Sequence, residues 1–197
     1  MGSPLRALIR VTAYLALTIV LLPVQILVLQ FNQSLSARLP LIYHRLCMRI
    51  LGFHIRTHGE ANERSPALFV CNHTSYSDIA ILGALLPASF VAKREVANWP
   101  LFGVLAKLQR TVFVDRSPSR ARFQLDEMKE RLESGDNLIL FPEGTSSDGN
   151  AVLPFKSALF SVAQIEANGK HLLVQPVSIA YTRLDGMPIG RALRPYF

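Results

Sequence analysis

Residues 67–86 read ALFVCNHTSYSDIAILGALL, and this stretch decides the fold. Its first five residues are all apolar, which is typical of a short strand buried on both faces. A polar segment follows at residues 72–78, and an apolar helical pattern begins at Ile79. Ser75, with Asp78 three residues later, approximates a capping box and places Asp78 in the first turn of that helix. The stretch therefore predicts a buried strand, a loop and a helix in succession.

The same succession recurs along the rest of the chain. The clearest helical pattern lies between two strand-like runs, begins after Ser117-Pro118 and stops at Gly135. Strands that alternate with helices indicate an α/β fold with a mainly parallel sheet flanked by helices. The predicted strands are residues 67–71, 89–92, 111–114, 137–141 and 172–177, and the clearest helix is residues 118–134.

The N-terminal part of the chain differs in texture from the remainder. Residues 11–29 carry no charge, and about 20 apolar residues are needed to cross the hydrocarbon core of a bilayer. Residues 39–51 predict an amphipathic helix that can lie in the headgroup layer. We therefore expect an N-terminal membrane-associated helix pair over 1–52 and a second domain over 53–197. Pro23 and the flanking arginines leave open whether the first helix crosses the bilayer or re-enters it. A cleaved signal peptide is the alternative, but its cleavage site is weak.

The amino-acid composition limits which classes of binding partner the chain can have. Half of the 197 residues are hydrophobic and the formal net charge is +7, which suits an anionic membrane surface or a nucleic acid. The hydropathy favours the membrane, and no nucleic-acid reader motif is present, so no nucleic-acid partner is predicted. His54 and His58 lie four residues apart in a stretch that alternates like a strand, with no carboxylate motif beside them. We predict no metal site.

His73 and Asp78 are the first candidates for chemistry. The turn before the helix can bring the imidazole of His73 back to the carboxylate of Asp78. In such a couple the carboxylate accepts one ring N–H while the other ring nitrogen takes a proton. No serine lies in a G-x-S-x-G context, so a substrate hydroxyl is the expected nucleophile. The pair alone does not establish chemistry, because Asp78 could equally be a helix-capping residue and His73 a polar residue of the turn.

A second cluster lies at residues 140–149, after another predicted strand. Loops at the carboxyl ends of parallel strands are where α/β sheets place their sites. Gly144 permits close backbone approach and Thr145 offers a hydrogen-bond donor. Arg116 follows the strand at 111–114 and precedes a helix, which makes an anion site. If the 140–149 loop stood alone, it could equally be an ordinary turn. Arg116 alone could equally be a solvated arginine that pairs with Asp115.

The ordered set of motifs resembles the glycerolipid acyltransferase family, which includes bacterial lysophosphatidic acid acyltransferases. Asn72-His73-x4-Asp78 resembles its catalytic block, and Phe113-Val114-Asp115-Arg116 its acceptor-binding block. Phe141-Pro142-Glu143-Gly144-Thr145 is similar to the third block, and Val174-Gln175-Pro176-Val177 to the last. All four occur in order, and the resemblance covers about residues 53–181.

The resemblance implies an enzyme that moves a fatty acyl group from acyl-carrier protein or coenzyme A to the hydroxyl of a lysolipid. By the family's pattern His73 is the general base and Asp78 orients it. Arg116, Glu143, Gly144 and Thr145 are implied to bind the acceptor. No metal and no cofactor beyond the thioester co-substrate is implied. We expect membrane localisation, in a bacterial inner membrane with the active site at the cytoplasmic face.

One departure from the family's pattern concerns the acceptor. Many members carry arginine after Glu-Gly-Thr, where this chain has Ser146. The sequence here looks more like the branch that includes lyso-ornithine lipid acyltransferases, although Arg116 and Lys156 keep lysophosphatidic acid open. Family members usually continue beyond the last block, which raises the alternative of a domain truncated at its C-terminus. The rival function is a non-catalytic membrane-surface protein that only binds lipids.

Overall fold

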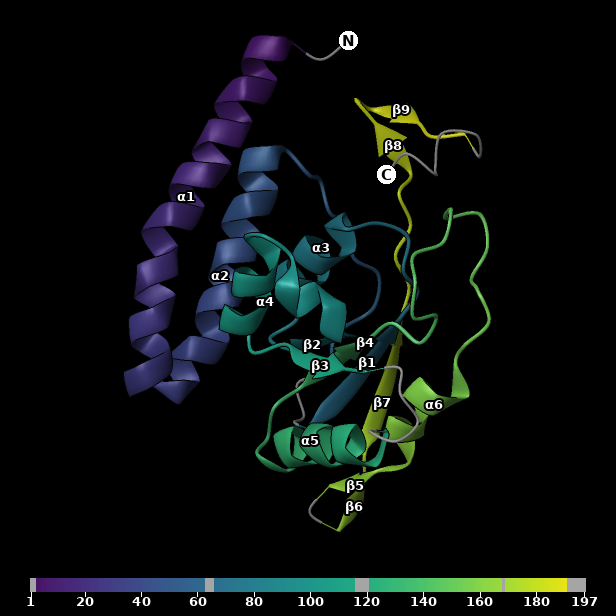
Figure 1. Ribbon diagram of the computed structural model, residues 1–197. Coiled ribbons are helices and arrows are strands. Elements are labelled where there is room, and N and C mark those ends of the chain that lie inside the picture. The colour runs from purple at the N-terminus through teal and green to yellow at the C-terminus, as the bar shows by residue number, and fades with distance from the viewer. Residues whose placement is uncertain (1–2, 63–65, 116–120, 168, 191–197) are drawn as a thin grey trace.

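Two long helices form a hairpin at the N-terminus (Figure 1). The computed structural model describes residues 3–62, 66–115, 121–167 and 169–190. Helix α1 spans Pro4–Phe31 and continues through Pro23, and α2 spans Gln33–Leu51. The side chain of Asn32 accepts a hydrogen bond from the backbone of Leu35 and so caps α2. Helix α2 ends at Gly52, whose left-handed backbone (φ 81°) is the usual helix stop.

A five-stranded sheet forms the centre of the second part of the chain. Its order is β3-β2-β4-β1-β7, and all four neighbouring pairs are parallel. The predicted α/β fold with a mainly parallel sheet is therefore confirmed. The strands are β1 (Ala67–Cys71), β2 (Ser89–Lys93), β3 (Val112–Val114), β4 (Leu138–Leu140) and β7 (Leu173–Val177). Two short antiparallel pairs join β5 (Glu166–Ala167) with β6 (Lys170–His171), and β8 (Arg183–Leu184) with β9 (Met187–Pro188).

Helices cover both faces of the sheet (Figure 1). Alternate residues of β1 point to opposite faces, as the pleat requires. Leu68 packs in a core cluster with Leu132 of α5, and Phe69 in a separate cluster with Leu82 of α3. The remaining elements are helices α3 (Ser77–Leu85), α4 (Phe102–Leu108), α5 (Ala121–Glu133) and α6 (Ser157–Phe160), with 3-10 helices η1 (Arg94–Asn98) and η3 (Ser161–Gln164).

The helical hairpin packs on α3 rather than on the sheet itself. Cys47 and Met48 of α2 share a buried cluster with residues of α3. The ring of His44 lies against Gly83, where a Cβ atom would collide with it. Arg45 Nε donates a 2.9 Å hydrogen bond to the carbonyl of Ala84 near the end of α3. Helix α2 therefore holds α3 in place, and α3 carries Asp78 in its first turn.

Some predicted elements differ from those in the structure. Helix α2 begins at residue 33 rather than 39, because the Asn32 cap starts it earlier. The strand-like reading of residues 53–58 is wrong, because this segment pairs with no strand and its side chains are exposed. The predicted helix start at Ser117-Pro118 lies outside the described residues. Helix α5 itself runs from Ala121 to Glu133, and Gly135 follows with a left-handed backbone (φ 86°).

Candidate active site

The loop after β1 is anchored to the strand beside it. Asn72 Nδ2 donates to the carbonyl of Ile179 at 3.0 Å, and Asn72 Oδ1 accepts from the Ile179 N–H at 2.8 Å. These two bonds extend the β1–β7 pairing beyond the last strand residues. The loop that starts at His73 is therefore fixed at the carboxyl edge of the sheet.

His73 and Asp78 are in direct contact in the structure. Nδ1 of His73 lies 2.8 Å from Oδ2 of Asp78. The same oxygen accepts the backbone N–H groups of Thr74 at 2.7 Å and Ser75 at 2.9 Å. Burial by itself raises the pKa of Asp78, but hydrogen bonds from His73, Ser75, Tyr181 and Thr74 outweigh it and hold that pKa below its usual range. Asp78 is therefore ionised at neutral pH.

The ionised carboxylate fixes the tautomer of His73. A carboxylate only accepts hydrogen bonds, so Nδ1 of His73 carries the proton and Nε2 keeps its lone pair. The ring stacks on Phe141 with centroids 4.2 Å apart and is 17% exposed. The two predicted catalytic residues thus form a couple with one basic nitrogen available. Their catalytic role stays a prediction.

Tyr181 is a site residue that the sequence did not reveal. Its hydroxyl donates a 2.7 Å hydrogen bond to Oδ1 of Asp78 from a position 103 residues away. Burial, followed by the neighbouring carboxylate, raises the pKa of Tyr181, so its hydroxyl stays protonated and donates. No local pattern identifies it, and its place four residues after the Val174–Val177 block is the only pointer in the sequence.

Glu143 is buried and supports the His73 loop. Its Oε1 accepts the backbone N–H of His73 at 2.7 Å, and its Oε2 accepts the backbone N–H of Leu153 at 2.7 Å. The side chain is among the most deeply buried described in the structure. Both oxygens are thus engaged by the protein itself, which favours a positioning role. The predicted contact between Glu143 and an acceptor stays a prediction.

Gly144 and Thr145 lie in a loop that rests against the His73 loop. The N–H of Ser147 donates to the carbonyl of His73 at 2.8 Å. Gly144 has a left-handed backbone (φ 64°), and a Cβ there would lie 3.1 Å from Nζ of Lys156. The Lys156 ammonium therefore lies close to the backbone of Gly144, and Thr145, the next residue, is exposed. Arg116, the remaining predicted acceptor-binding residue, lies outside the described residues.

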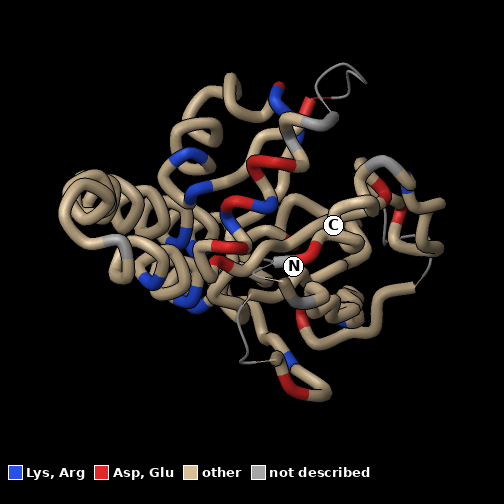
Figure 2. The backbone as a smooth tube through the Cα atoms, turned by 90° about the horizontal axis from the view of Figure 1, so that it is seen from below, with Lys and Arg blue, Asp and Glu red and all other residues tan. Residues whose placement is uncertain are grey.

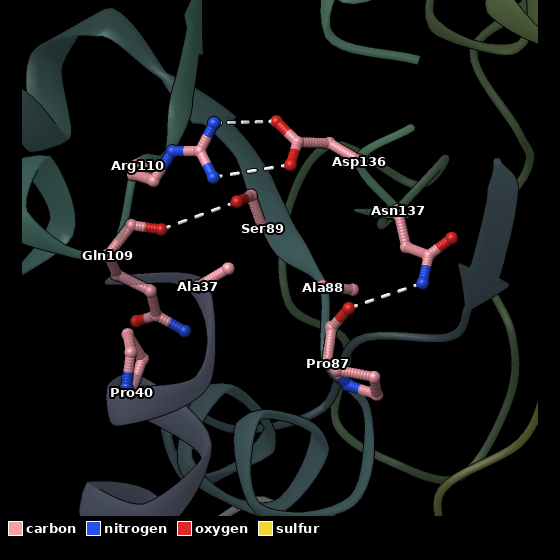
Figure 3. A pocket seen from close by; sticks show the side chains of 9 residues that line it. All are labelled: Ala37, Pro40, Pro87, Ala88, Ser89, Gln109, Arg110, Asp136 and Asn137. Atoms are coloured by element: carbon pink, nitrogen blue, oxygen red, sulfur yellow. Dashed lines mark hydrogen bonds and ion pairs between the residues drawn. The ribbon is translucent and has the colours of Figure 1, made fainter. Parts of the chain in front are cut away.

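Two small hollows bracket the sheet. The first lies at the amino ends of β2 and β4, on the edge opposite His73, and has room for about one water at about 20 Å³ (Figure 3). Its charged groups are paired, with Arg110 2.8 Å from Asp136. The second, of similar size, is lined by Thr74, Gly149, Ile179, Ala180 and Tyr181 beside the His73–Asp78 couple. Among the described residues no group of three His, Cys, Asp or Glu is placed to hold a metal.

Comparison with known proteins gives a consistent result. The sequence model of the acyltransferase family matches residues 54–180. A lyso-ornithine lipid O-acyltransferase from Brucella abortus is 49% identical, over 99% of this chain and 74% of that protein. One from Rhizobium meliloti is 43% identical, over 90% of this chain and 62% of that protein. A 1-acyl-sn-glycerol-3-phosphate acyltransferase from Neisseria gonorrhoeae is 40% identical over 54% of this chain and 42% of that protein.

The fold also matches a solved structure. The crystal structure of the 1-acyl-sn-glycerophosphate (LPA) acyltransferase from Thermotoga maritima superposes with a TM-score of 0.60. The match covers 98% of this chain and 91% of that chain at 20% sequence identity. At this identity the likeness concerns the fold, including the arrangement of a parallel sheet with helices.

Proposed function

The chain belongs to the acyltransferase family, and from this premise we propose that it transfers a fatty acyl group from a thioester to the hydroxyl of a lysolipid. The donor is an acyl-carrier protein or coenzyme A thioester. The observation that carries the proposal is the His73–Asp78 couple, with Nδ1 bound to the carboxylate at 2.8 Å. This geometry leaves Nε2 as the base for an incoming hydroxyl.

His73 and Asp78 can account for every proton transfer in the proposed reaction. His73 Nε2 takes the proton of the acceptor hydroxyl as its oxygen forms a bond to the thioester carbonyl carbon. Asp78 stabilises the resulting imidazolium. The tetrahedral oxyanion then collapses, the carbon–sulfur bond breaks, and the imidazolium returns its proton to the leaving thiolate. The products are an ester and a free thiol, so this transfer uses no redox partner and no cofactor beyond the acyl donor.

Membrane attachment through α1 is part of the proposal. Among the described residues, α1 is the helix that is long and apolar enough to cross a membrane, and most of its apolar stretch is not buried within the protein. An acceptor with a long acyl chain partitions into a bilayer, so an enzyme that acts on it benefits from being anchored there. We propose a bacterial inner membrane with His73 on the cytoplasmic side.

For the acceptor we propose lyso-ornithine lipid. Support comes from the 49% identity to a lyso-ornithine lipid O-acyltransferase over nearly the whole chain. Ser146, where many family members have arginine, fits a headgroup without a phosphate, since a phosphate monoester carries close to two negative charges. Lysophosphatidic acid is the second candidate, because the Lys156 ammonium beside Gly144 offers a cation for a phosphate.

Replacement of His73 tests the transfer itself. Membranes that contain the His73→Ala variant should lose acyl transfer from labelled acyl-carrier protein while the variant stays folded. His54→Ala is a matched control, because His54 is exposed and lies in a segment without helix or strand. Unchanged turnover in His73→Ala would refute the general base. A wild-type chain that binds lysolipid without turnover would favour the non-catalytic alternative.

A side-by-side panel tests the acceptor. Lyso-ornithine lipid, lysophosphatidic acid and other lysophospholipids are assayed at matched surface concentration in the same mixed vesicles. We expect the highest kcat/KM with lyso-ornithine lipid. A clear preference for lysophosphatidic acid would move the assignment to the second candidate, and equal rates would make the enzyme a broad-range lysolipid acyltransferase.

A further inference from the structure

Residues 99–104 expose four large apolar side chains within six residues. Trp99, Leu101, Phe102 and Val104 are each between 41% and 59% exposed, and together they are called the 99–104 patch. Single exposed apolar residues are ordinary on a protein surface, but a contiguous group marks an interaction surface. This segment plays no part in the hydrogen-bonded support of His73.

The backbone turns this patch outward. Gly103 is the buried residue of the segment, and a Cβ there would collide with the carbonyl of Ala97 in η1. Leu101, which precedes α4, has a left-handed backbone with φ 61°. A leucine in this conformation is strained, and such strain gathers at functional sites. Because the Leu101 side chain is exposed, burial within the protein does not compensate for the strain.

Helix α4 is tied to the apolar helix α1. Gln25 of α1 is buried, and its Nε2 donates a 2.8 Å hydrogen bond to the carbonyl of Leu108 at the end of α4. Val24 and Leu27, beside Gln25 in the sequence, are exposed. The patch therefore leads into a helix that is fixed against the proposed membrane segment, and we expect a bilayer that holds α1 to lie within its reach.

The charge of the N-terminal helices and of α4 suits anionic lipid. The first 59 residues contain six arginines and no Asp or Glu, and Figure 2 shows α1 and α2 with basic but no acidic positions. Lys107, on the same side of α4 as Val104 by helical spacing, is also exposed. Cations beside apolar and aromatic side chains are typical of segments that lie in the headgroup layer. Tryptophan is enriched there in particular.

The patch also borders the catalytic loop. The ring of Trp99 lies 6.0 Å from that of Tyr76, and Tyr76 is three residues from His73. We propose that the 99–104 patch is a second membrane contact, which enters the headgroup layer and holds the His73 loop at the bilayer surface. The inference rests on the proposed attachment through α1, and it adds a site that sets where the acceptor hydroxyl meets His73.

Trp99 provides a direct test because it is the only tryptophan in the sequence. The full chain is reconstituted in vesicles of neutral and anionic phospholipid, with lipids brominated near the headgroup end of the acyl chain as quenchers. We expect a blue-shifted emission, loss of most of the Trp99 fluorescence to brominated lipid, and protection from acrylamide. The proposal would be overturned if brominated lipid left the Trp99 emission unchanged while acrylamide quenched it. If the emission then shifts only on addition of acyl-carrier protein, the patch is a carrier site instead.

A variant tests the consequence for turnover. Leu101→Gly with Phe102→Ser removes two apolar side chains, and the glycine accommodates the φ of 61° at position 101. We expect about a tenfold lower kcat/KM for lysolipid in vesicles and wild-type turnover of a short-chain lysolipid dispersed in water. Phe123→Ser on α5 is the matched control, since Phe123 is 67% exposed on the other face of the sheet. Equal losses on both acceptors, or no loss on vesicles, would refute the inference.

The two experiments distinguish failure of this inference from failure of the proposed attachment through α1 and from failure of the proposed acyl transfer. A chain that fails to float with vesicles contradicts the attachment through α1. A chain that floats but transfers no acyl group contradicts the proposed function, while its Trp99 quenching still decides whether the patch enters the lipid.

Discussion

Replacing Glu143 with glutamine distinguishes two roles for this buried carboxylate. If Glu143 binds the acceptor, the change weakens acceptor binding and raises KM. If it holds the His73 loop, as its contacts with the His73 and Leu153 N–H groups indicate, the change disturbs the placement of the base. We expect the second result, a lower kcat with little change in KM.

The magnitude follows from the two 2.7 Å hydrogen bonds. Each joins a backbone N–H to a carboxylate oxygen, and a hydrogen bond to a charged group contributes about 1.5–3 kcal/mol. Glutamine keeps one acceptor oxygen but points an NH2 group at the other N–H, so one bond is lost and two donors face each other. A loss of about 2–3 kcal/mol in the catalytic arrangement corresponds to about a 30- to 150-fold lower kcat.

Steady-state acyl transfer in vesicles, with lysolipid varied at saturating donor, measures the effect of Glu143→Gln. The melting temperature of the same preparation should fall, because the two bonds also join the His73 loop to the segment at Leu153. Asp148→Asn is the control, since Asp148 lies exposed in the same loop and should leave kcat unchanged. A KM raised tenfold with unaltered kcat and melting temperature would refute the positioning role.

Two further changes address the Asp78 carboxylate. Tyr181→Phe removes the 2.7 Å hydrogen bond to Oδ1, so kcat should fall about tenfold at constant KM for lysolipid; a change confined to KM would speak against it. The second change is Asp78→Asn, and the loss of stability that it causes relative to wild type should depend on pH. Because folding lowers the pKa of Asp78, its stabilisation is full above the unfolded value of about 3.9 and disappears as pH falls through the folded value. The gap in melting temperature between wild type and variant should therefore narrow below about pH 4, and a constant gap from pH 7 to pH 3 would contradict this.

The sheet was predictable because its signal is local. Strands inside a parallel sheet are continuous apolar runs, and each of the five runs predicted as a strand became one of the five central strands. Residues 53–58 alternate in polarity as a strand does, yet form none, because a strand also needs a partner, and this segment pairs with none of the described strands. Periodicity reports which side chains can be buried, and it does not report what lies beside them.

The couple at the candidate site was predictable for a similar reason. His73 and Asp78 are five residues apart and are joined by one turn, so local chemistry suffices to suggest their contact. Tyr181 contacts Asp78 from a distant part of the chain, and Leu153 contacts Glu143, which in turn binds the backbone of His73. Their roles depend on how the strand ends come together in space. Tyrosine and leucine at those positions carry no spacing that would single them out.

The contacts around His73 change how the family's sequence blocks are understood. Asn72 binds the backbone beyond β7, Glu143 binds the backbone of His73, and Tyr181 binds Asp78. Three of the blocks and their flanks are therefore one hydrogen-bonded unit that orients a single imidazole. Groups used in this way have little freedom to select an acceptor. We therefore expect selection among lysolipids to depend on exposed residues near this unit, where Ser146 stands in place of the family's arginine and Lys156 offers a cation.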